Sequence, residues 1–172
     1  EDWPQVRENL LETLEHFRQI KIVTGVEIRL AFEPEPCCVL ETMVETVEFF
    51  SRMDFPEQYR PFIGICFDAC HQAVEYEQPA QCLAALAQAQ IPIMKVQVSS
   101  ALRAQGDEIP ALLKFAEPVY LHQAIARMDS GDALIRFGDL PEFARFLAEG
   151  NSPRECRVHF HVPIFIVHLG SC

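Results

Sequence analysis

Hydrophobic and polar residues follow two different periods along the chain, and together they predict alternating helices and strands. Apolar side chains recur at steps of three and four over residues 5–23 and 39–53, which is the spacing of amphipathic helices. Segments of strand length occupy residues 26–32, which are mostly apolar, and residues 62–67, which are continuously apolar, as expected of strands that are buried on both faces. The first part of the chain therefore repeats a helix and a buried strand.

The rest of the chain continues this alternation, with one long interruption. Its regular elements are predicted as a helix over 79–90, a strand over 91–99, a helix over 139–148 and a strand over 156–162. Between the strand over 91–99 and the helix over 139–148, residues 101–138 are predicted to form an elaborated loop with short helices near 108–116 and 120–128. Strands separated by helices pair in parallel through right-handed crossovers, so we expect about four parallel strands with helices on their faces.

Two architectures fit this order of elements, an open flavodoxin-like sheet and half of a (β/α)8 barrel. A complete barrel of this kind needs about 250 residues, and the chain has 172. Polar groups that can bind metal follow the strands at their carboxyl ends, where the sites of such barrels form, and this favours the barrel. We therefore predict one α/β domain over residues 1–172, half of a TIM barrel.

The candidate ligands lie at the ends of all the predicted strands. In chain order they are Glu33 and Glu35, Asp68 and His71, Gln97, and His159 and His161. Side chains alternate along a strand, so residues two apart point the same way. Carboxylate oxygens and imidazole nitrogens suit a divalent metal ion such as Mn²⁺, Zn²⁺ or Mg²⁺. Singly, each residue has an ordinary explanation as a loop acid, a helix cap or a structural histidine, but jointly they favour a metal site.

Composition narrows the classes of partner. The 14 basic and 25 acidic residues give a net charge of −11, and the basic residues form no patch, so nucleic acid is not expected as a partner. No run of about 18 apolar residues occurs, so no membrane insertion is expected. The seven cysteines are irregularly spaced, which favours reduced thiols and a cytoplasmic protein over a disulfide scaffold.

Several of these motifs resemble the xylose-isomerase-like TIM-barrel superfamily, which contains sugar isomerases, epimerases and apurinic-site endonucleases. The resemblance lies first in residues 30–34, Leu-Ala-Phe-Glu-Pro, and in residues 68–71, Asp-Ala-Cys-His. With residues 95–102, 120–123 and 157–163 included, it is closest to the barrel proteins of the ebo gene cluster, a subfamily linked to the traffic of secondary metabolites.

The resemblance implies a metal-binding protein of the sugar isomerase or epimerase type, acting on a sugar-like or hydroxy-carbonyl metabolite. A divalent metal would hold adjacent oxygens of such a substrate and polarise its carbonyl group. The expected metal ligands are Glu33, Asp68, Gln97, His159 and His161, the expected catalytic residues are Glu33 and His71, and the expected substrate-binding residues are Lys95, Arg103 and His122. Two alternatives stay open: a metabolite carrier without turnover, and a zinc phosphodiesterase of the apurinic endonuclease type.

Two features depart from the family. The last strand carries His159 and His161 where the isomerases carry a glutamate, so the sequence supports metal binding better than isomerase catalysis. The family barrel has eight strands, and the resemblance implies that this chain is its C-terminal half. Half a barrel would leave open sheet edges, which invite pairing. We therefore expect either a missing N-terminal half or a homo-oligomer.

Overall fold

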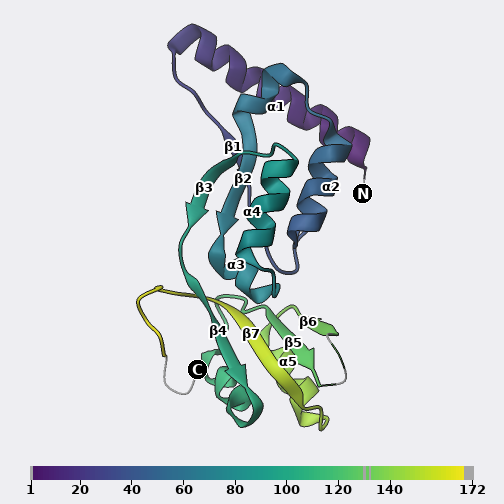
Figure 1. Ribbon diagram of the computed structural model, residues 1–172, viewed down its shortest axis with the longest axis vertical. Coiled ribbons are helices and arrows are strands. Elements are labelled where there is room, and N and C mark those ends of the chain that lie inside the picture. Colours follow the sequence, from purple (N-terminus) through teal and green to yellow (C-terminus); the bar gives the residue numbers. More distant parts are fainter. Residues whose placement is uncertain (1, 130, 132, 169–172) are drawn as a thin grey trace.

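The computed structural model describes residues 2–129, 131 and 133–168, and it contains two β-sheets (Figure 1). The first sheet is parallel, with the strand order β1 (Leu30–Phe32), β2 (Ile63–Asp68) and β3 (Ile93–Gln97). The second sheet is antiparallel, with the strand order β4 (Ser100–Gln105), β7 (Pro153–Val162), β5 (Ala124–Met128) and β6 (Leu134–Phe137).

The helices begin and end where the sequence supplies caps. They are α1 (Trp3–Thr24), α2 (Met43–Met53), α3 (Ala69–Val74), α4 (Pro79–Gln88) and α5 (Leu140–Ala148), with 3₁₀ helices η1 (Glu57–Phe62) and η2 (Gly106–Phe115). Gly25 adopts a left-handed conformation with φ of 76° and ends α1. Thr42 and Glu45 form a capping box at the start of α2. The helices predicted over 5–23, 39–53, 79–90 and 139–148 are confirmed, with small shifts at their ends.

β2 is the buried centre of the first sheet. All its residues are buried, as its continuous apolar run predicts. Gly64 lets β3 approach closely, because a Cβ atom there would lie 2.3 Å from the carbonyl oxygen of Pro92 and 2.8 Å from Cγ of Met94. Helices α2 and α4 pack together against this sheet through a shared apolar cluster. The carboxyl ends of the parallel strands point towards α3 and the second sheet (Figure 1).

The predicted half of a TIM barrel is wrong. Such a half needs a fourth parallel strand, but β7, the strand predicted for that place, pairs antiparallel with β4 and β5. The reason lies after β3, because only Val98 and Ser99 separate it from β4. A chain that returns to a parallel neighbouring position needs a crossover of about a dozen residues or more. The chain therefore passes directly from the first sheet into the second.

The segment 101–138 is more regular than predicted. The helix expected near 108–116 is present as η2, but the helix expected near 120–128 is wrong, because β5 lies there. β5 lies inside the second sheet between β7 and β6, and its first three residues are fully buried. A short apolar run suits a helix or a strand equally well. Here the segment forms a strand because it pairs with β7 on one side and β6 on the other.

The two sheets meet at α3. Cys70 and Val74 of this helix pack with Tyr76 and with Ile125 of β5. The hydroxyl group of Tyr76 also donates a hydrogen bond to the carbonyl oxygen of Ile125 at 3.2 Å. This junction brings α3, which directly follows β2, next to β7, so polar residues from both sheets can share one site.

Candidate metal centre

Three histidines converge where the two sheets meet, and we call them the histidine cluster. His71 comes from α3, and His159 and His161 come from β7. The Nε2 atom of His159 lies 3.0 Å from Nε2 of His71 and 3.0 Å from Nε2 of His161. The rings meet edge to face, with centroids 4.5–5.5 Å apart. His159 thus faces both other rings, and each pair of these histidines shares a ligand group with a third side chain, although no group found among the described residues holds all three.

Local structure explains why these rings meet. Asp68 is the N-cap of α3, and its Oδ1 atom accepts hydrogen bonds from the backbone N–H groups of Cys70 at 2.7 Å and His71 at 3.2 Å. The cap starts the helix at the end of β2 and fixes His71 in its first turn. Residues two apart on a strand lie on the same face, so His159 and His161 both face α3.

The tautomer of His71 follows from its other ring nitrogen. Nδ1 lies 3.0 Å from the carbonyl oxygen of Pro34, and a carbonyl oxygen can only accept a hydrogen bond. The proton of the neutral ring is therefore on Nδ1, and Nε2 directs an unshared electron pair towards His159. The side chain of His71 is only 3 % exposed, so bulk water has little access to this ring.

The tautomer of His159 is fixed through two further side chains. Its Nδ1 lies 2.7 Å from Oε1 of Gln123, and Nε2 of Gln123 donates to Oε1 of Glu35 at 3.4 Å. This second hydrogen bond orients the amide with its oxygen towards His159, which must then donate from Nδ1. The Nε2 atom of His159 therefore also carries an unshared pair, 3.0 Å from Nε2 of His71.

Two unshared pairs that face each other suit a cation between them. Burial, and then the neighbouring His71 and His161, lower the pKa of His159 to about 4, so this ring is neutral at neutral pH. A divalent ion fits the geometry, because two histidine nitrogens bound at about 2.0–2.1 Å to one tetrahedral Zn²⁺ lie about 3.3 Å apart, close to the 3.0 Å between these atoms. Metal-bound histidines also usually donate their other N–H group to an oxygen, as His71 and His159 do here.

Three other side chains bring a potential ligand atom close to the histidine cluster. The groups whose ligand atoms all lie within 4.8 Å of one another are Asp68 with His71 and His161, Glu35 with His71 and His159, and Cys70 with His159 and His161. The Oδ2 atom of Asp68 is buried, has no hydrogen-bond partner among the described residues and lies 3.9 Å from Nδ1 of His161. Burial raises the pKa of Cys70 to about 12. Asp68 is therefore the best candidate for a fourth ligand.

Two of the predicted ligands, Glu33 and Gln97, lie beside the histidine cluster. The amide of Gln97 donates to Oε1 of Glu33, and this oxygen lies 3.6 Å from Nδ1 of His71, the nitrogen that faces Pro34. Glu33 belongs to none of the ligand groups found among the described residues. Lys95 donates to Gln97 at 3.2 Å and so adjoins the site. A ligand role for Glu33 or Gln97 stays a prediction.

The other two predicted substrate-binding residues have protein partners of their own. Arg103 on β4 pairs with Glu155 on β7, with 2.9 Å between Nη2 and Oε2. His122 is 5 % exposed, stacks on Phe160 and has its Nδ1 atom 3.0 Å from the carbonyl oxygen of Tyr120. These contacts stabilise the second sheet, and a substrate-binding role for either residue stays a prediction.

Ser99 and Gln123 complete the site but are not among the residues predicted for it. The Oγ atom of Ser99 lies 2.7 Å from Nδ1 of His161. Ser99 follows Gln97 by two residues, and this spacing is a usable sequence signal. Gln123 lies in the segment predicted as a helix, so the sequence gives no comparable signal. The backbone N–H of His159 donates to the carbonyl oxygen of Gln123 at 2.8 Å, next to the paired strands β5 and β7.

Comparisons with known proteins identify no relative of this chain. No family model, no curated protein and no solved structure matches it significantly. None of the described helices combines enough length and apolar character to cross a membrane. The case for a function therefore rests on the histidine cluster and its surroundings.

Proposed function

We propose that this protein binds a divalent transition-metal ion, with Zn²⁺ as the best match, through the Nε2 atoms of His71, His159 and His161. Three imidazole nitrogens suit Zn²⁺ better than Mg²⁺, which prefers oxygen ligands. The observation that carries the proposal is the pair of unprotonated Nε2 atoms 3.0 Å apart on His71 and His159. Pro34 and Gln123 hold the opposite nitrogens of these rings.

The surroundings of the cluster give it a closed side and an open side. The side chain of Asp68 is fully buried, whereas 47 % of the side chain of His161 is exposed. Protein ligands on one side and access on the other are features of catalytic rather than structural zinc sites. When bound, the metal would polarise a carbonyl oxygen or acidify a water molecule. We infer that a small, oxygen-bearing metabolite reaches the site from the side of His161.

Two carboxylates are placed to move protons at this site. Oε1 of Glu35 lies 3.6 Å from Nδ1 of His159, and Oε1 of Glu33 lies 3.6 Å from Nδ1 of His71. Both oxygens lie on the Nδ1 side of the rings, and a pair of carboxylates near a metal site can remove a proton from one carbon of a bound substrate and return it to its neighbour. This pair favours the isomerase or epimerase reaction on a hydroxy-carbonyl metabolite as the second candidate function, ahead of a carrier or a phosphodiesterase.

Titration of the metal-free protein with Zn²⁺ tests the metal site. We expect one ion per chain and, with Co²⁺ in its place, the visible absorption of a nitrogen-bound ion of low coordination number. His159→Ala should lower the affinity for Zn²⁺ at least about a hundredfold, because it removes the nitrogen that the other two rings face. Asp68→Asn keeps an oxygen to cap α3 but loses the charge, so it should weaken binding by about tenfold and leave the fold unchanged.

The matched control is His16→Ala. His16 is an exposed histidine on α1, so its removal should leave the affinity for Zn²⁺ unchanged. If His159→Ala bound Zn²⁺ as tightly as the wild type, with the same circular dichroism spectrum, the proposed metal site would be wrong. If the metal bound but Glu35→Gln turned over a hydroxy-aldehyde as fast as the wild type, only the isomerase proposal would be lost.

A further inference from the structure

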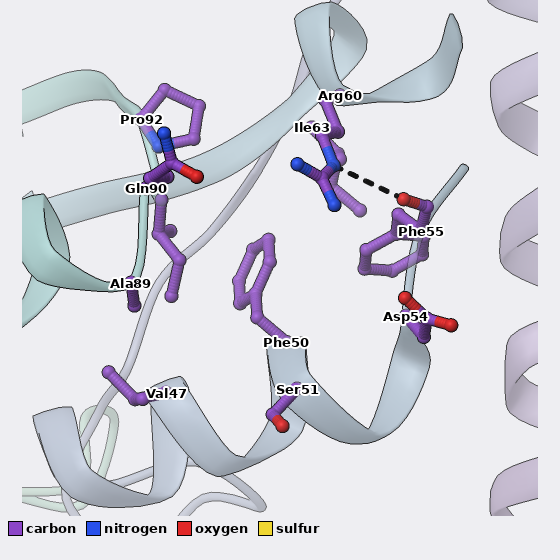
Figure 2. A pocket seen from close by; sticks show the side chains of 11 residues that line it. Val47, Phe50, Ser51, Asp54, Phe55, Arg60, Ile63, Ala89, Gln90 and Pro92 are labelled. Atoms are coloured by element: carbon purple, nitrogen blue, oxygen red, sulfur yellow. Dashed lines mark hydrogen bonds between the residues drawn. The ribbon is translucent and has the colours of Figure 1, made fainter. Parts of the chain in front are cut away.

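A second pocket lies at the opposite end of the parallel sheet from the histidine cluster. It has a volume of about 370 Å³ and is formed by α2, by the start of β2 and by the segment between α4 and β3 (Figure 2). Its apolar walls are Val47, Phe50, Ile63, Ile91 and Pro92. A mostly apolar pocket of this size with a few polar groups is typical of sites for small organic molecules.

Arg60 of η1 reaches into this pocket. Figure 2 shows its guanidinium group directed into the space between Phe50 and Phe55. The Nε atom of Arg60 donates to the carbonyl oxygen of Phe55 at 3.3 Å, which holds the group in place and leaves its Nη atoms towards the pocket. None of the ion pairs among the described residues includes Arg60.

Arg7 and Arg52 also form no ion pair among the described residues, but of these three arginines only Arg60 lines the pocket. The net charge is −11, and Arg18, Arg103 and Arg136 each pair with a glutamate. Arg60 is exposed, and a guanidinium group beside an apolar surface suits an anion that accepts two parallel hydrogen bonds, which means a carboxylate or a phosphate. Asp54 lies beside Phe55 at the edge of the pocket (Figure 2), and its charge repels a phosphate dianion more than a single carboxylate.

We propose that this pocket binds a small apolar monocarboxylate, with its carboxylate on Arg60 and its hydrocarbon part against Val47 and Phe50. Gln90 and Ser51 also line the pocket, and their side chains can bond to further polar groups of the ligand. The pocket lies at the amino ends of the parallel strands and shares no residue with the histidine cluster. It therefore gives the protein a second ligand, an organic acid, that does not require the metal.

Isothermal titration calorimetry with 3-phenylpropionate tests this assignment. The buffer contains a chelator, so that no metal at the histidine cluster can hold a carboxylate. We expect one binding site per chain, with an affinity at least tenfold higher than for 3-phenylpropan-1-ol, which has the same ring and chain but no charge. Phenyl phosphate should bind more weakly than the carboxylate.

Variants locate the binding in this pocket. Arg60→Gln should weaken the binding of 3-phenylpropionate at least tenfold and leave the binding of the alcohol unchanged. Arg52→Gln is the control with the same change in charge, because Arg52 lies on α2 over the ring of Trp3 and outside the pocket. Ala89 is exposed and lines the pocket, so Ala89→Phe should block all three compounds.

Several outcomes would overturn the proposal. Equal affinity of the wild type for the acid and the alcohol would remove the role of the charge, and this comparison needs no variant. Tighter binding of phenyl phosphate would make the pocket a phosphate site instead. Unchanged binding in a folded Arg60→Gln variant would place the ligand elsewhere. Arg60→Lys keeps the charge without the forked geometry, so an affinity between those of the wild type and Arg60→Gln would support paired hydrogen bonds.

Discussion

Gln123 decides which nitrogen of His159 is free to bind a metal. Its oxygen accepts the Nδ1–H group at 2.7 Å, and this leaves Nε2 unprotonated. In Gln123→Ala the ring can move its proton to Nε2 and can rotate, so we expect the affinity for Zn²⁺ to fall about 10- to 100-fold. Competition with a chromophoric chelator measures this change, and thermal unfolding of the metal-free protein should change little.

The control for this prediction removes an amide that is far from the site. Gln19 lies on α1 and donates to Glu15 at 2.7 Å, so Gln19→Ala should bind Zn²⁺ like the wild type. An unchanged affinity in Gln123→Ala would show that another contact sets the tautomer of His159. The hydrogen bond from Gln123 to Glu35 would then be a structural contact only.

Single residues of the site were partly predictable from the sequence. Asp68 and His71 follow an apolar strand, and His159 and His161 alternate along another, so residue type and local position were enough to select them. Gln123 was missed because its place depends on which strands pair next to it. Short-range patterns contain no information about that pairing, since it joins segments far apart in the sequence.

At the scale of elements, β7 also shows that local sequence patterns do not reveal which strands pair. Its alternating side chains predict a strand over 156–162, and the strand is present and longer, at Pro153–Val162. Its direction was predicted wrongly, because direction depends on the neighbouring strands β4 and β5. Residues 101–138 were predicted as a loop with short helices, so these neighbours were absent from the prediction. The half barrel followed from that omission.

Glu155 ties β7 to β4 and makes this pair of strands sensitive to acid. Burial raises its pKa, but hydrogen bonds from Arg103, Arg157 and Gln105 outweigh burial and bring the pKa of Glu155 to about 2. The charged form therefore stabilises the fold, fully above the pKa of about 4.3 in an unfolded chain. This contribution, up to about 3 kcal/mol, is lost as the pH falls from there through about 2.

Urea unfolding between pH 7 and pH 2 measures this contribution. The wild type should lose it over the acid range, whereas Glu155→Gln should be less stable at pH 7 and depend less on pH. Glu8→Gln is the control, because Glu8 is exposed on α1 and should follow the wild-type curve. Parallel curves for the wild type and Glu155→Gln would contradict the prediction.

At the scale of the whole molecule, the histidine cluster is one of several links between the two sheets. The others include the packing of α3 on β5 and the ion pairs of Arg136 on β6 with Glu41 at 2.9 Å and with Glu75 at 2.6 Å. A metal bound by His71 on one side and by His159 and His161 on the other would add a link of a different kind. It would join the sheets through bonds that form only when the ion is present.

This link predicts that Zn²⁺ stabilises both sheets together. A ligand at 100 times its dissociation constant adds about 2.7 kcal/mol to stability, which corresponds to a rise in Tm of roughly 5–11 °C for a chain of this length. Hydrogen exchange should slow in β2 and α3 and also in β7, because the ion holds residues from each. Ca²⁺, which prefers oxygen ligands, should produce neither effect, and His16→Ala should respond like the wild type. If exchange slowed around His71 alone, the ion would not join the two sheets. The other ligands of the ion would then come from α3 and from the segment before α2, where Glu35 lies.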